Sequence, residues 1–450
     1  MLISKYSQPE FNPYQDDSPE TDDAAWPAPQ PHGDLSAHLT LPGSKSLTNR
    51  ELVLAALADG PSLIRSPLHS NDTTNMVHAL RSLGTTITDQ PGNSAFGADW
   101  LVTPAEELLG STTVDCGLAG TVMRFVPPLA GLALGPTMFD ADPSARTRPM
   151  STMIDSLRAL GVDINDDAQG TLPFTVHGYG RVSGGTVTID ASASSQFVSG
   201  LLLVAPRFEK GLHLIHSGGR LPSMPHIEMT IATLAARGVN VASPSIGEWV
   251  VEPGPIAARD LDMEPDLSNA APFLAAAVVA GGSVTIAGWP AETTQVGDHL
   301  AELLPLFGAT ASREGDRLTV TGGQGIHGVD LDLTLGGELA PALVAIACFA
   351  DSPSTFTGIG HIRNHETDRL ASLAAEINAL GGNVTELEDG LRIDPQPLSA
   401  GLWHTYDDHR MATAGAVIGL RVPGLEIENV ETTAKTLPQF TELWQDMLGR

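Results

Sequence analysis

The sequence contains very little lysine and has a strong excess of acidic residues. Lysine occurs only at positions 5, 45, 210 and 435, and the formal net charge is −29. Because a field of this sign repels polyanions, nucleic acid and anionic membranes are not expected as partners. An anionic ligand can bind only where the fold gathers positive groups locally.

The sequence also lacks the features typical of secreted and membrane proteins. Its two cysteines, Cys116 and Cys348, are too few for a disulfide framework, and we expect Cys116 to be a small buried residue. The apolar stretch at residues 271–280 is too short to span a bilayer. No basic segment followed by an apolar one occurs in the first residues, so no secretory signal is predicted and a cytoplasmic location is expected.

Length and composition favour more than one domain. With 450 residues, of which 42% are hydrophobic, the chain is long enough for about two or three substantial cores. Residues 1–32 are rich in Pro, Asp and Glu without periodicity, and we predict that they form a disordered acidic tail.

Two series of helical segments each recur six times along the chain. Helices of the first series end in glycine, at Gly84, Gly161, Gly238, Gly308, Gly381 and Gly449. Five of the six continue into an alternating segment, which is typical of a helix stopped by glycine and followed by a strand. Helices of the second series begin near Ser46, Thr121, Gln196, Asn269, Leu339 and Arg410, and a turn and a short strand follow each.

Six such units are too many for one core, because single cores stop growing near about 250–300 residues. Three units in each of two similar globular halves is the natural division. The charged, proline-containing stretch 259–266 interrupts the pattern and marks the boundary. The sequence therefore predicts an α/β fold of two similar lobes, with helices packed inside a skin of strands and a cleft between the lobes. We expect residues 44–263 in the first lobe and residues 33–43 plus 264–450 in the second.

The starts of the second-series helices carry Gly, Ser, Asp and Asn with ionisable residues between them, as in GSKS at 43–46 and DDHRM at 407–411. Such starts expose backbone N–H groups and hydroxyls. If the six units are arranged alike, two facing lobes direct six positive helix ends into one cleft. That cleft would favour multiply charged anions.

Seven motifs occur in the order LPGSKSLTNR (41–50), GLAGTVMRF (117–125), SARTRPM (144–150), ASSQFVSGLL (193–202), HETDRL (365–370), YDDHRMA (406–412) and AKTLPQF (434–440). They resemble the successive signatures of the 5-enolpyruvylshikimate-3-phosphate (EPSP) synthase family of enolpyruvyl transferases. The resemblance implies two domains of three βαβαββ units each. It also implies transfer of the enolpyruvyl group of phosphoenolpyruvate to the 5-hydroxyl of shikimate 3-phosphate, through a tetrahedral intermediate that loses phosphate. It implies no metal or other cofactor.

The resemblance assigns roles to matching residues. Phosphoenolpyruvate would be surrounded by Lys45, Gly120, Arg148, Gln196, Arg369, Arg410 and Lys435. Shikimate 3-phosphate would be bound by Lys45, Ser46, Arg50, Ser194, Ser195, Gln196, Ser223, Glu338 and His365. The catalytic residues would be Lys45, Lys435, the candidate base Glu338, and Glu366 as the proton shuttle at C3. Glu338 and Glu366 also fit a plainer interpretation, in which each is an acidic residue favoured at a helix start.

Three histidines depart from the family pattern. His365 and His361 stand where many members have lysine and asparagine, and His226 stands where they have tyrosine. Because histidine titrates at about pH 6.5, His365 and His361 lead us to expect that binding of shikimate 3-phosphate weakens as the pH rises.

Other functions stay open at this point. The sister enolpyruvyl transferase that acts on UDP-N-acetylglucosamine shares the fold and the donor, but it has a Lys-Asn pair where this chain has Lys45 and Ser46. A non-catalytic repeat scaffold that binds anions would also fit the sixfold pattern. A zinc site at His361 and His365 lacks further spaced ligands. We expect small-molecule partners only, and a monomer.

Replacing Lys45 tests the enzymatic interpretation. Lys45→Met removes a positive charge assigned to both substrates, so it should abolish turnover while the fold stays intact. Phosphate release measures the first effect and circular dichroism the second. Lys210→Met, at a lysine without an assigned role, is the matched control, and a Lys45→Met enzyme that retained most of its activity would contradict the assignment.

Overall fold

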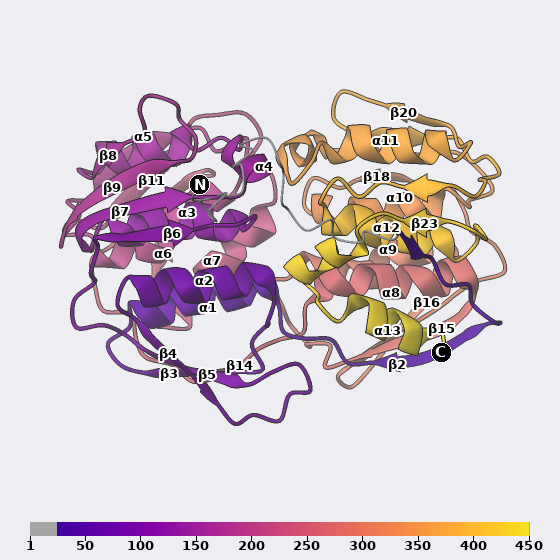
Figure 1. The fold of residues 1–450 in the computed structure, drawn as a ribbon, viewed down its shortest axis with the longest axis horizontal. Coiled ribbons are helices and arrows are strands. Elements are labelled where there is room, and N and C mark those ends of the chain that lie inside the picture. The colour runs from indigo at the N-terminus through magenta and orange to yellow at the C-terminus, as the bar shows by residue number, and fades with distance from the viewer. Residues whose placement is uncertain (1–24, 450) are drawn as a thin grey trace, which may run out of the picture.

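The computed structural model describes residues 25–449 of the chain, and these form two halves lying side by side (Figure 1). Helices α1 to α7 belong to the first half and α8 to α13 to the second. Each half consists of helices surrounded by small sheets, which confirms the predicted α/β fold class of two similar lobes. Within the described part of the chain, no helix is long and apolar enough to cross a membrane.

The first half contains three consecutive units. Its helices are α1 (Lys45–Ala56), α2 (Asn71–Ser82), α3 (Gly120–Ala130), α4 (Pro143–Arg146), α5 (Ser151–Ala159), α6 (Gln196–Val204), η1 (Ala205–Arg207) and α7 (Met224–Ala235). Its strands are β3 (Ser62–Arg65), β4 (Thr86–Gln90), β5 (Asp99–Thr103), β6 (Thr112–Asp115), β7 (Leu134–Asp140), β8 (Asp163–Asn165), β9 (Phe174–Tyr179), β10 (Gly185–Ile189), β11 (Leu212–His216), β12 (Val241–Ala242), β13 (Glu248–Val251) and β14 (Leu261–Asp262).

The second half repeats this plan. Its helices are α8 (Leu267–Ala280), η2 (Val296–His299), α9 (Leu300–Leu306), η3 (Gly337–Leu339), α10 (Ala340–Ala347), η4 (Gly360–Asn364), α11 (Arg369–Ala379), α12 (His409–Gly419), η5 (Val430–Lys435) and α13 (Phe440–Met447). Its strands are β1 (Trp26–Pro27), β2 (Leu35–Leu39), β15 (Gly282–Ala287), β16 (Thr310–Glu314), β17 (Arg317–Thr321), β18 (Asp330–Asp332), β19 (Ser354–Thr357), β20 (Val384–Glu386), β21 (Leu391–Ile393), β22 (Leu402–Trp403) and β23 (Glu426–Ile427).

Five of the sheets share one strand order, for which β6-β7-β9-β8 is the pattern. The first strand of each unit runs parallel to the second, and the last strand pairs antiparallel with both the second and the third. A parallel pair requires a crossover, and a helix such as α3 provides it. The sixth sheet is smaller and has the order β1-β23-β22.

Two strands are exchanged between the halves. β2 comes directly before α1 of the first half in the chain but runs parallel to β15 of the second half. β14 comes directly before α8 of the second half but runs parallel to β3 of the first half. In Figure 1 the indigo β2 accordingly lies among the later strands on the right. The two crossing segments meet at an antiparallel bridge between Gly43 and Pro265. These pairings support the division into residues 44–263 and residues 33–43 plus 264–450, which stays a prediction.

Each glycine that was predicted to stop a first-series helix has a left-handed backbone. The φ angles are 101° at Gly84, 95° at Gly161, 79° at Gly238, 95° at Gly308, 95° at Gly381 and 70° at Gly449. Only glycine adopts this conformation without a steric penalty from Cβ. The six helix ends are therefore determined locally by the sequence.

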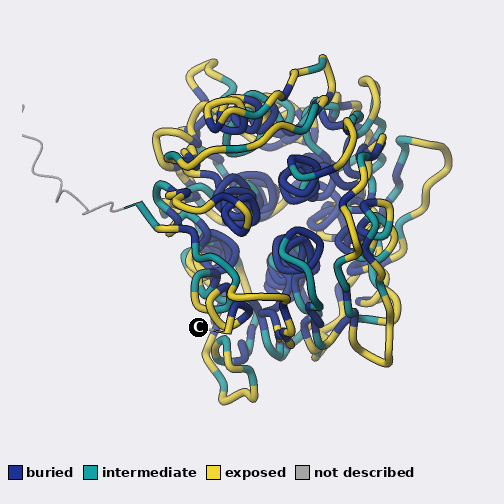
Figure 2. The backbone as a smooth tube through the Cα atoms, turned by 90° about the vertical axis from the view of Figure 1, so that its right-hand side faces the viewer, coloured by how far each residue is buried: buried dark blue, intermediate teal, exposed yellow. Residues whose placement is uncertain are grey.

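Separate apolar cores fill the two halves. The second-series helices lie inside them, and every residue of α10 and α12 is buried. Figure 2 shows these buried helices in dark blue within an outer layer of more exposed chain. Small residues such as Ala and Gly allow these helices to be enclosed on all sides. Their polar termini are the parts that remain to line a cleft.

The predicted disordered tail was too long. Residues 1–24 lie outside the described part of the chain, but Trp26 and Pro27 form β1, which pairs with β23. The Trp26 ring lies 6.5 Å from the ring of Phe440, and Ala28 is buried. The prediction was therefore wrong for residues 25–32, because an aromatic contact with a distant helix orders a segment that has no periodicity of its own.

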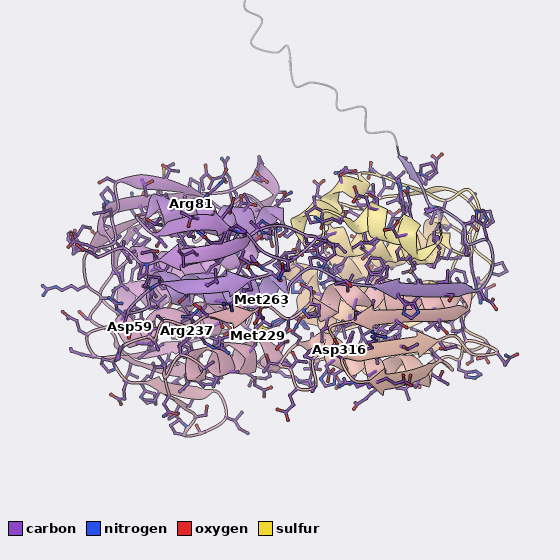
Figure 3. All side chains as sticks on the ribbon, turned by 90° about the horizontal axis from the view of Figure 1, so that it is seen from below. Asp59, Arg81, Met229, Arg237, Met263 and Asp316 are labelled. Carbon is purple, nitrogen blue, oxygen red and sulfur yellow. The ribbon has the colours of Figure 1, made fainter. Side chains whose placement is uncertain are left out.

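A buried ion pair connects α1 to the turn after α7. Arg237 donates from Nε to Glu51 Oε2 over 2.9 Å, and its side chain is fully buried. The same guanidinium donates to the Ser62 hydroxyl and to the Ala257 carbonyl. Figure 3 shows the position of Arg237 in the first half. Because α1 and α7 both reach the cleft, this pair helps to fix their relative position.

Replacing Arg237 should destabilise the first half. Arg237→Met leaves the Glu51 carboxylate buried without its main partner, so we expect a loss of about 3–5 kcal/mol in the free energy of unfolding. Arg259 also approaches Glu51, at 3.6 Å, but its side chain is 42% exposed. Arg259→Met should therefore cost less than about 1 kcal/mol.

Urea unfolding followed by tryptophan fluorescence measures both variants. Combining Arg237→Met with Glu51→Leu should recover most of the loss, because no unpaired charge then remains. Equal losses for the two arginine variants would contradict the importance of the buried pair.

Candidate active site

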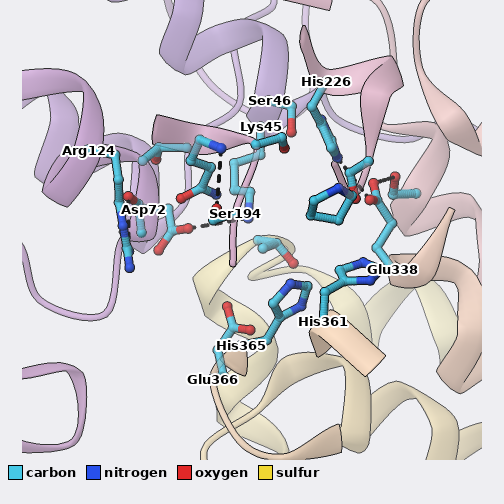
Figure 4. Close-up of a pocket in the computed structure, with 18 of the residues that line it drawn as sticks. Lys45, Ser46, Asp72, Arg124, Ser194, His226, Glu338, His361, His365 and Glu366 are labelled. Carbon is cyan, nitrogen blue, oxygen red and sulfur yellow. Dashed lines mark hydrogen bonds and ion pairs between the residues drawn. The ribbon is translucent and has the colours of Figure 1, made fainter. Parts of the chain in front are cut away.

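A pocket lies between the two halves and is lined by helix starts from both (Figure 4). Fourteen of the fifteen residues with a predicted role in the site line it, namely Lys45, Ser46, Arg50, Gly120, Arg148, Ser194, Ser195, Gln196, Ser223, Glu338, His365, Glu366, Arg369 and Arg410. Lys435 lies directly behind the lining, where its Nζ contacts Glu366. The structure thus brings together all of the predicted site residues, from nine segments of the chain.

The start of α1 positions Lys45. Ser44 is the N-cap and accepts a hydrogen bond from the backbone N–H of Leu47, as the GSKS pattern indicates. The Lys45 ammonium lies 3.4 Å from the Asp72 carboxylate. Its backbone N–H donates to Asp266 Oδ2 over 2.9 Å, and Asp266 Oδ1 caps α8 at the same time. One carboxylate therefore binds helix starts from both halves.

Arg50 is bound closely by protein groups. It donates to Thr230 Oγ1 over 2.8 Å and to the carbonyls of Ser46 and His226 over 2.8 and 2.9 Å. Burial lowers the pKa of its guanidinium to about 9, against the opposing effect of Glu338. Arg50 lines the pocket, but in this structure its hydrogen bonds join α1 to α7.

Two cations from opposite halves share one backbone carbonyl. Arg148 and Lys435 both donate to the oxygen of Leu118, over 2.9 and 2.8 Å. Both side chains are largely buried. Lys435 also pairs with the Glu366 carboxylate, whereas Arg148 has no carboxylate partner among the described residues, so an anion that enters beside Arg148 would be favoured.

Glu366 is enclosed by positive groups. Its Oε1 accepts from Lys435 over 2.6 Å and its Oε2 accepts from Arg369 over 2.8 Å. Arg369 is fixed in turn by Asp408, over 2.7 Å, and contacts Nδ1 of His365. Burial acts to raise the pKa of Glu366, but Lys435 and Arg369 outweigh it and hold the pKa well below the usual value. Glu366 is therefore ionised and must first take up a proton before it can donate one.

Glu338 accepts a hydrogen bond on each carboxylate oxygen. His226 Nε2 lies 2.9 Å from Oε2, and the Ser268 hydroxyl lies 2.9 Å from Oε1. Burial acts to raise the pKa of Glu338, but His226, Arg410 and the hydrogen bond from Ser268 together lower it. The side chain is thus an oriented carboxylate at the cleft, which is the form that a general base requires.

The two histidines of the η4 region do not titrate near neutral pH. Burial lowers the pKa of His361 to about 4, although Glu338 acts in the opposite direction. Burial and then the charge of Arg369 hold the pKa of His365 well below 6.5. An affinity for shikimate 3-phosphate that weakens with rising pH therefore stays a prediction, and the burial of these two histidines gives it no support. The sequence identified the histidines but not the burial that keeps them neutral.

Several residues in or directly behind the pocket lining were not predicted. Arg124 lies one turn after Gly120, within 5.8 Å of the Phe197 ring, and burial lowers its pKa to about 9. Asp72 pairs with Lys45, and Asp408 fixes Arg369. Arg124 belongs to the GLAGTVMRF motif and Asp408 to YDDHRMA, but neither motif by itself shows what these two side chains contact. For Asp72 the signal was weaker, since it resembles any acidic residue of a helix start.

Among residues 25–449, no group of three or more His, Cys, Asp or Glu side chains is arranged to hold a metal ion. His361 and His365 do lie close together, with ring centroids 5.8 Å apart. Without a third ligand beside them, the zinc alternative has no support from the arrangement of the described residues.

The described fold aligns with solved structures over nearly the whole length of the chain. EPSP synthase from Acinetobacter baumannii aligns with a TM-score of 0.77 at 23% identity, covering 94% of this chain and 97% of that one. The enolpyruvyl transferase NikO from Streptomyces tendae aligns with a TM-score of 0.71 at 17% identity, covering 93% and 96%. The fold is therefore that of the enolpyruvyl transferases.

Sequence comparison then identifies the family. The family model of EPSP synthase (3-phosphoshikimate 1-carboxyvinyltransferase) matches residues 29–444. A 3-phosphoshikimate 1-carboxyvinyltransferase from Kocuria rhizophila is 54% identical over 432 residues, which cover 95% of this chain and 97% of the relative. The chain belongs to the EPSP synthase family.

The buried His361 should make stability depend on pH. In the unfolded chain it takes up a proton near about pH 6.5, whereas its folded pKa is about 4. Between these values the unfolded state binds more protons, so this contribution to stability is fully present above about pH 6.5 and is lost as the pH falls toward 4.

Comparison with His361→Gln, whose side chain does not titrate, isolates this effect. Between about pH 7 and pH 5, wild type should lose about 2 kcal/mol more of its free energy of unfolding than the variant does. Urea unfolding at the two pH values measures the difference. Equal losses would show that His361 is not held neutral in the folded protein.

Proposed function

We propose that this protein transfers the enolpyruvyl group of phosphoenolpyruvate to the 5-hydroxyl of shikimate 3-phosphate, giving 5-enolpyruvylshikimate 3-phosphate and phosphate. The observation that carries the proposal is the convergence of Lys45, Arg148, Arg369, Arg410 and Lys435 on one cleft, in a chain with a net charge of −29. Two polyanionic substrates require such a concentration of positive charge. The activity named for the Kocuria relative supports it.

Phosphoenolpyruvate is assigned to the side of the cleft where Arg148 and Lys435 share the Leu118 carbonyl. Arginine grips carboxylate and phosphate with two parallel hydrogen bonds, whereas lysine provides a compact charge that can follow the departing phosphate. Gly120 starts α3 here, and a Cβ on it would lie 3.2 Å from Gln196 Oε1. The absence of a side chain thus keeps space beside Gln196.

Shikimate 3-phosphate is assigned to the starts of α6 and α7. Ser194 and Ser195 lie at the start of α6, and Ser223 is the N-cap of α7, with a φ of 51°. Hydroxyls and free N–H groups at helix starts suit a phosphate. Ser46 and Arg50 would then meet the ring carboxylate, while Glu338 and His365 face the ring from the second half.

The proposed chemistry is addition followed by elimination. The Glu338 carboxylate accepts the proton of the hydroxyl, whose oxygen forms a bond to C2 while Glu366, once protonated, delivers its proton to C3. In the second step a proton leaves C3 for Glu366, the double bond re-forms and the C2–O bond to phosphate breaks. The departing phosphate takes up one proton, and Glu338 releases the proton that it took from the hydroxyl, so both carboxylates return to their starting state. Lys435, 2.6 Å from Glu366, provides a route for the proton that Glu366 gains and loses. The cations near Leu118 stabilise the negative charge on phosphate.

The sister reaction on UDP-N-acetylglucosamine has less support. That enzyme uses a cysteine on a mobile loop, whereas Cys116 is completely buried beside the start of α3. Burial raises the pKa of its thiol to about 12. Cys116 is therefore an inert small residue, as its sequence context predicted. The monomeric state and the cytoplasmic location stay predictions.

A phosphate-release assay tests the proposed reaction. With phosphoenolpyruvate and shikimate 3-phosphate, and with a chelator present, the protein should release phosphate and form one enolpyruvyl product per phosphate. Replacing shikimate 3-phosphate with UDP-N-acetylglucosamine, or omitting the acceptor altogether, should give no phosphate release above background. Release with the UDP-sugar alone would transfer the assignment to the sister reaction, and no release with either acceptor would favour the anion-binding scaffold.

A further inference from the structure

The candidate base is contacted by a side chain from the opposite half of the protein. His226 belongs to the first turn of α7, in the first half, and Glu338 belongs to η3, in the second. Nε2 of His226 lies 2.9 Å from Oε2 of Glu338, and the two side chains are 19% and 17% exposed. Figure 4 shows the two side chains directed toward one another at the edge of the pocket.

The backbone around His226 is held in place independently of Glu338. Its carbonyl accepts hydrogen bonds from Arg50 over 2.9 Å and from the Thr230 hydroxyl over 2.9 Å, and its N–H donates to the Ser223 carbonyl over 3.0 Å. Arg50 belongs to α1, so the start of α7 is fixed to the neighbouring helix of its own half. The imidazole therefore projects from a rigid support.

Glu338 is held differently on its two oxygens. Oε1 accepts from Ser268, which belongs to the same half, and the Ser268 carbonyl is itself bound by Arg410 over 2.8 Å. Oε2 accepts from His226 alone among the described residues. Each carboxylate oxygen has two lone pairs, so either one can still accept a hydrogen bond from a ligand hydroxyl. The bond from Ser268 exists within one half, whereas the bond from His226 forms only when the halves are together.

We propose that His226 is a positioning residue for Glu338, and that closure of the cleft orients the base through this hydrogen bond. The inference rests on the proposed function. An imidazole with its proton on Nε2 donates to Oε2 and fixes the plane of the carboxylate, so that Oε1 faces the acceptor hydroxyl. The proton of that hydroxyl then passes to Glu338, while His226 keeps its own proton.

This assignment differs from direct substrate binding by His226. A residue that binds the acceptor contributes mainly to its KM. A residue that orients the base contributes to the proton transfer and therefore to kcat. If His226 orients the base, another hydrogen-bond donor of the right length should be able to replace the imidazole, even without a ring.

Three variants of His226 test the proposal. His226→Phe keeps the ring but has no donor, and we expect kcat to fall about 10- to 100-fold, because loss of alignment in a reacting group has effects of this size. The KM for phosphoenolpyruvate and the KM for shikimate 3-phosphate should each change less than about threefold. His226→Gln places an amide N–H near the position of Nε2 and should recover most of kcat, whereas His226→Asn, shorter by one methylene, should not.

A double-variant cycle separates orientation of the base from a general structural effect. In a Glu338→Gln background the base is absent, so adding His226→Phe should lower the residual kcat less than about threefold. Ser268→Ala is the matched control, because it removes the donor to the other oxygen from within the same half. Thermal unfolding of each variant reports whether the fold is retained.

Each result has a defined meaning. A rise in the acceptor KM with unchanged kcat would overturn the proposal in favour of direct binding. Equal losses from His226→Phe with and without Glu338, or failure of His226→Gln to exceed His226→Asn, would overturn it in favour of a structural role. A wild-type enzyme without turnover would overturn the proposed function itself. An active wild type whose kcat is unaffected by His226→Phe would overturn only the role proposed for His226.

Discussion

Charge compensation across the cleft is the constraint on which the rest of the structure depends. Buried positive groups from both halves are stable only if each has an acceptor, and they find it in Glu366, Asp408 and the Leu118 carbonyl. These acceptors lie at or before helix starts, where small residues let helices approach closely. A protein with a net charge of −29 can therefore present a positive interior to anions, while its acidic side chains mostly remain outside.

Much of the fold could be predicted because the ends of many of its helices are determined by the local sequence. A glycine with positive φ ends each first-series helix, and this depends on a single residue type. The two-residue strand formed by Trp26 and Pro27 could not be predicted in the same way. It is ordered by Phe440 and by β23, more than 350 residues away in the chain, and no local pattern reports such contacts.

The candidate site was predictable where it uses a residue type that is rare in this sequence. Lys45 and Lys435 stood out because lysine is so rare, and both reach the cleft or its immediate border. The protonation of His361 was not predictable, since it depends on how much protein surrounds the ring after folding. The partner of Glu338 was also hidden, because His226 reaches it only through the packing of one half against the other.

The exchange of strands gives the junction between the halves a particular mechanical character. Residues 42–44 and 264–266 run antiparallel there, joined by hydrogen bonds from Ser44 to Glu264 and from Asp266 to Pro42. A single linker would allow the halves to swivel in any direction. Two linkers bonded to one another resist torsion and shear but still bend, so relative motion is confined largely to one axis. Each closing movement then returns the same side chains to the same partners, without any separate device to guide it.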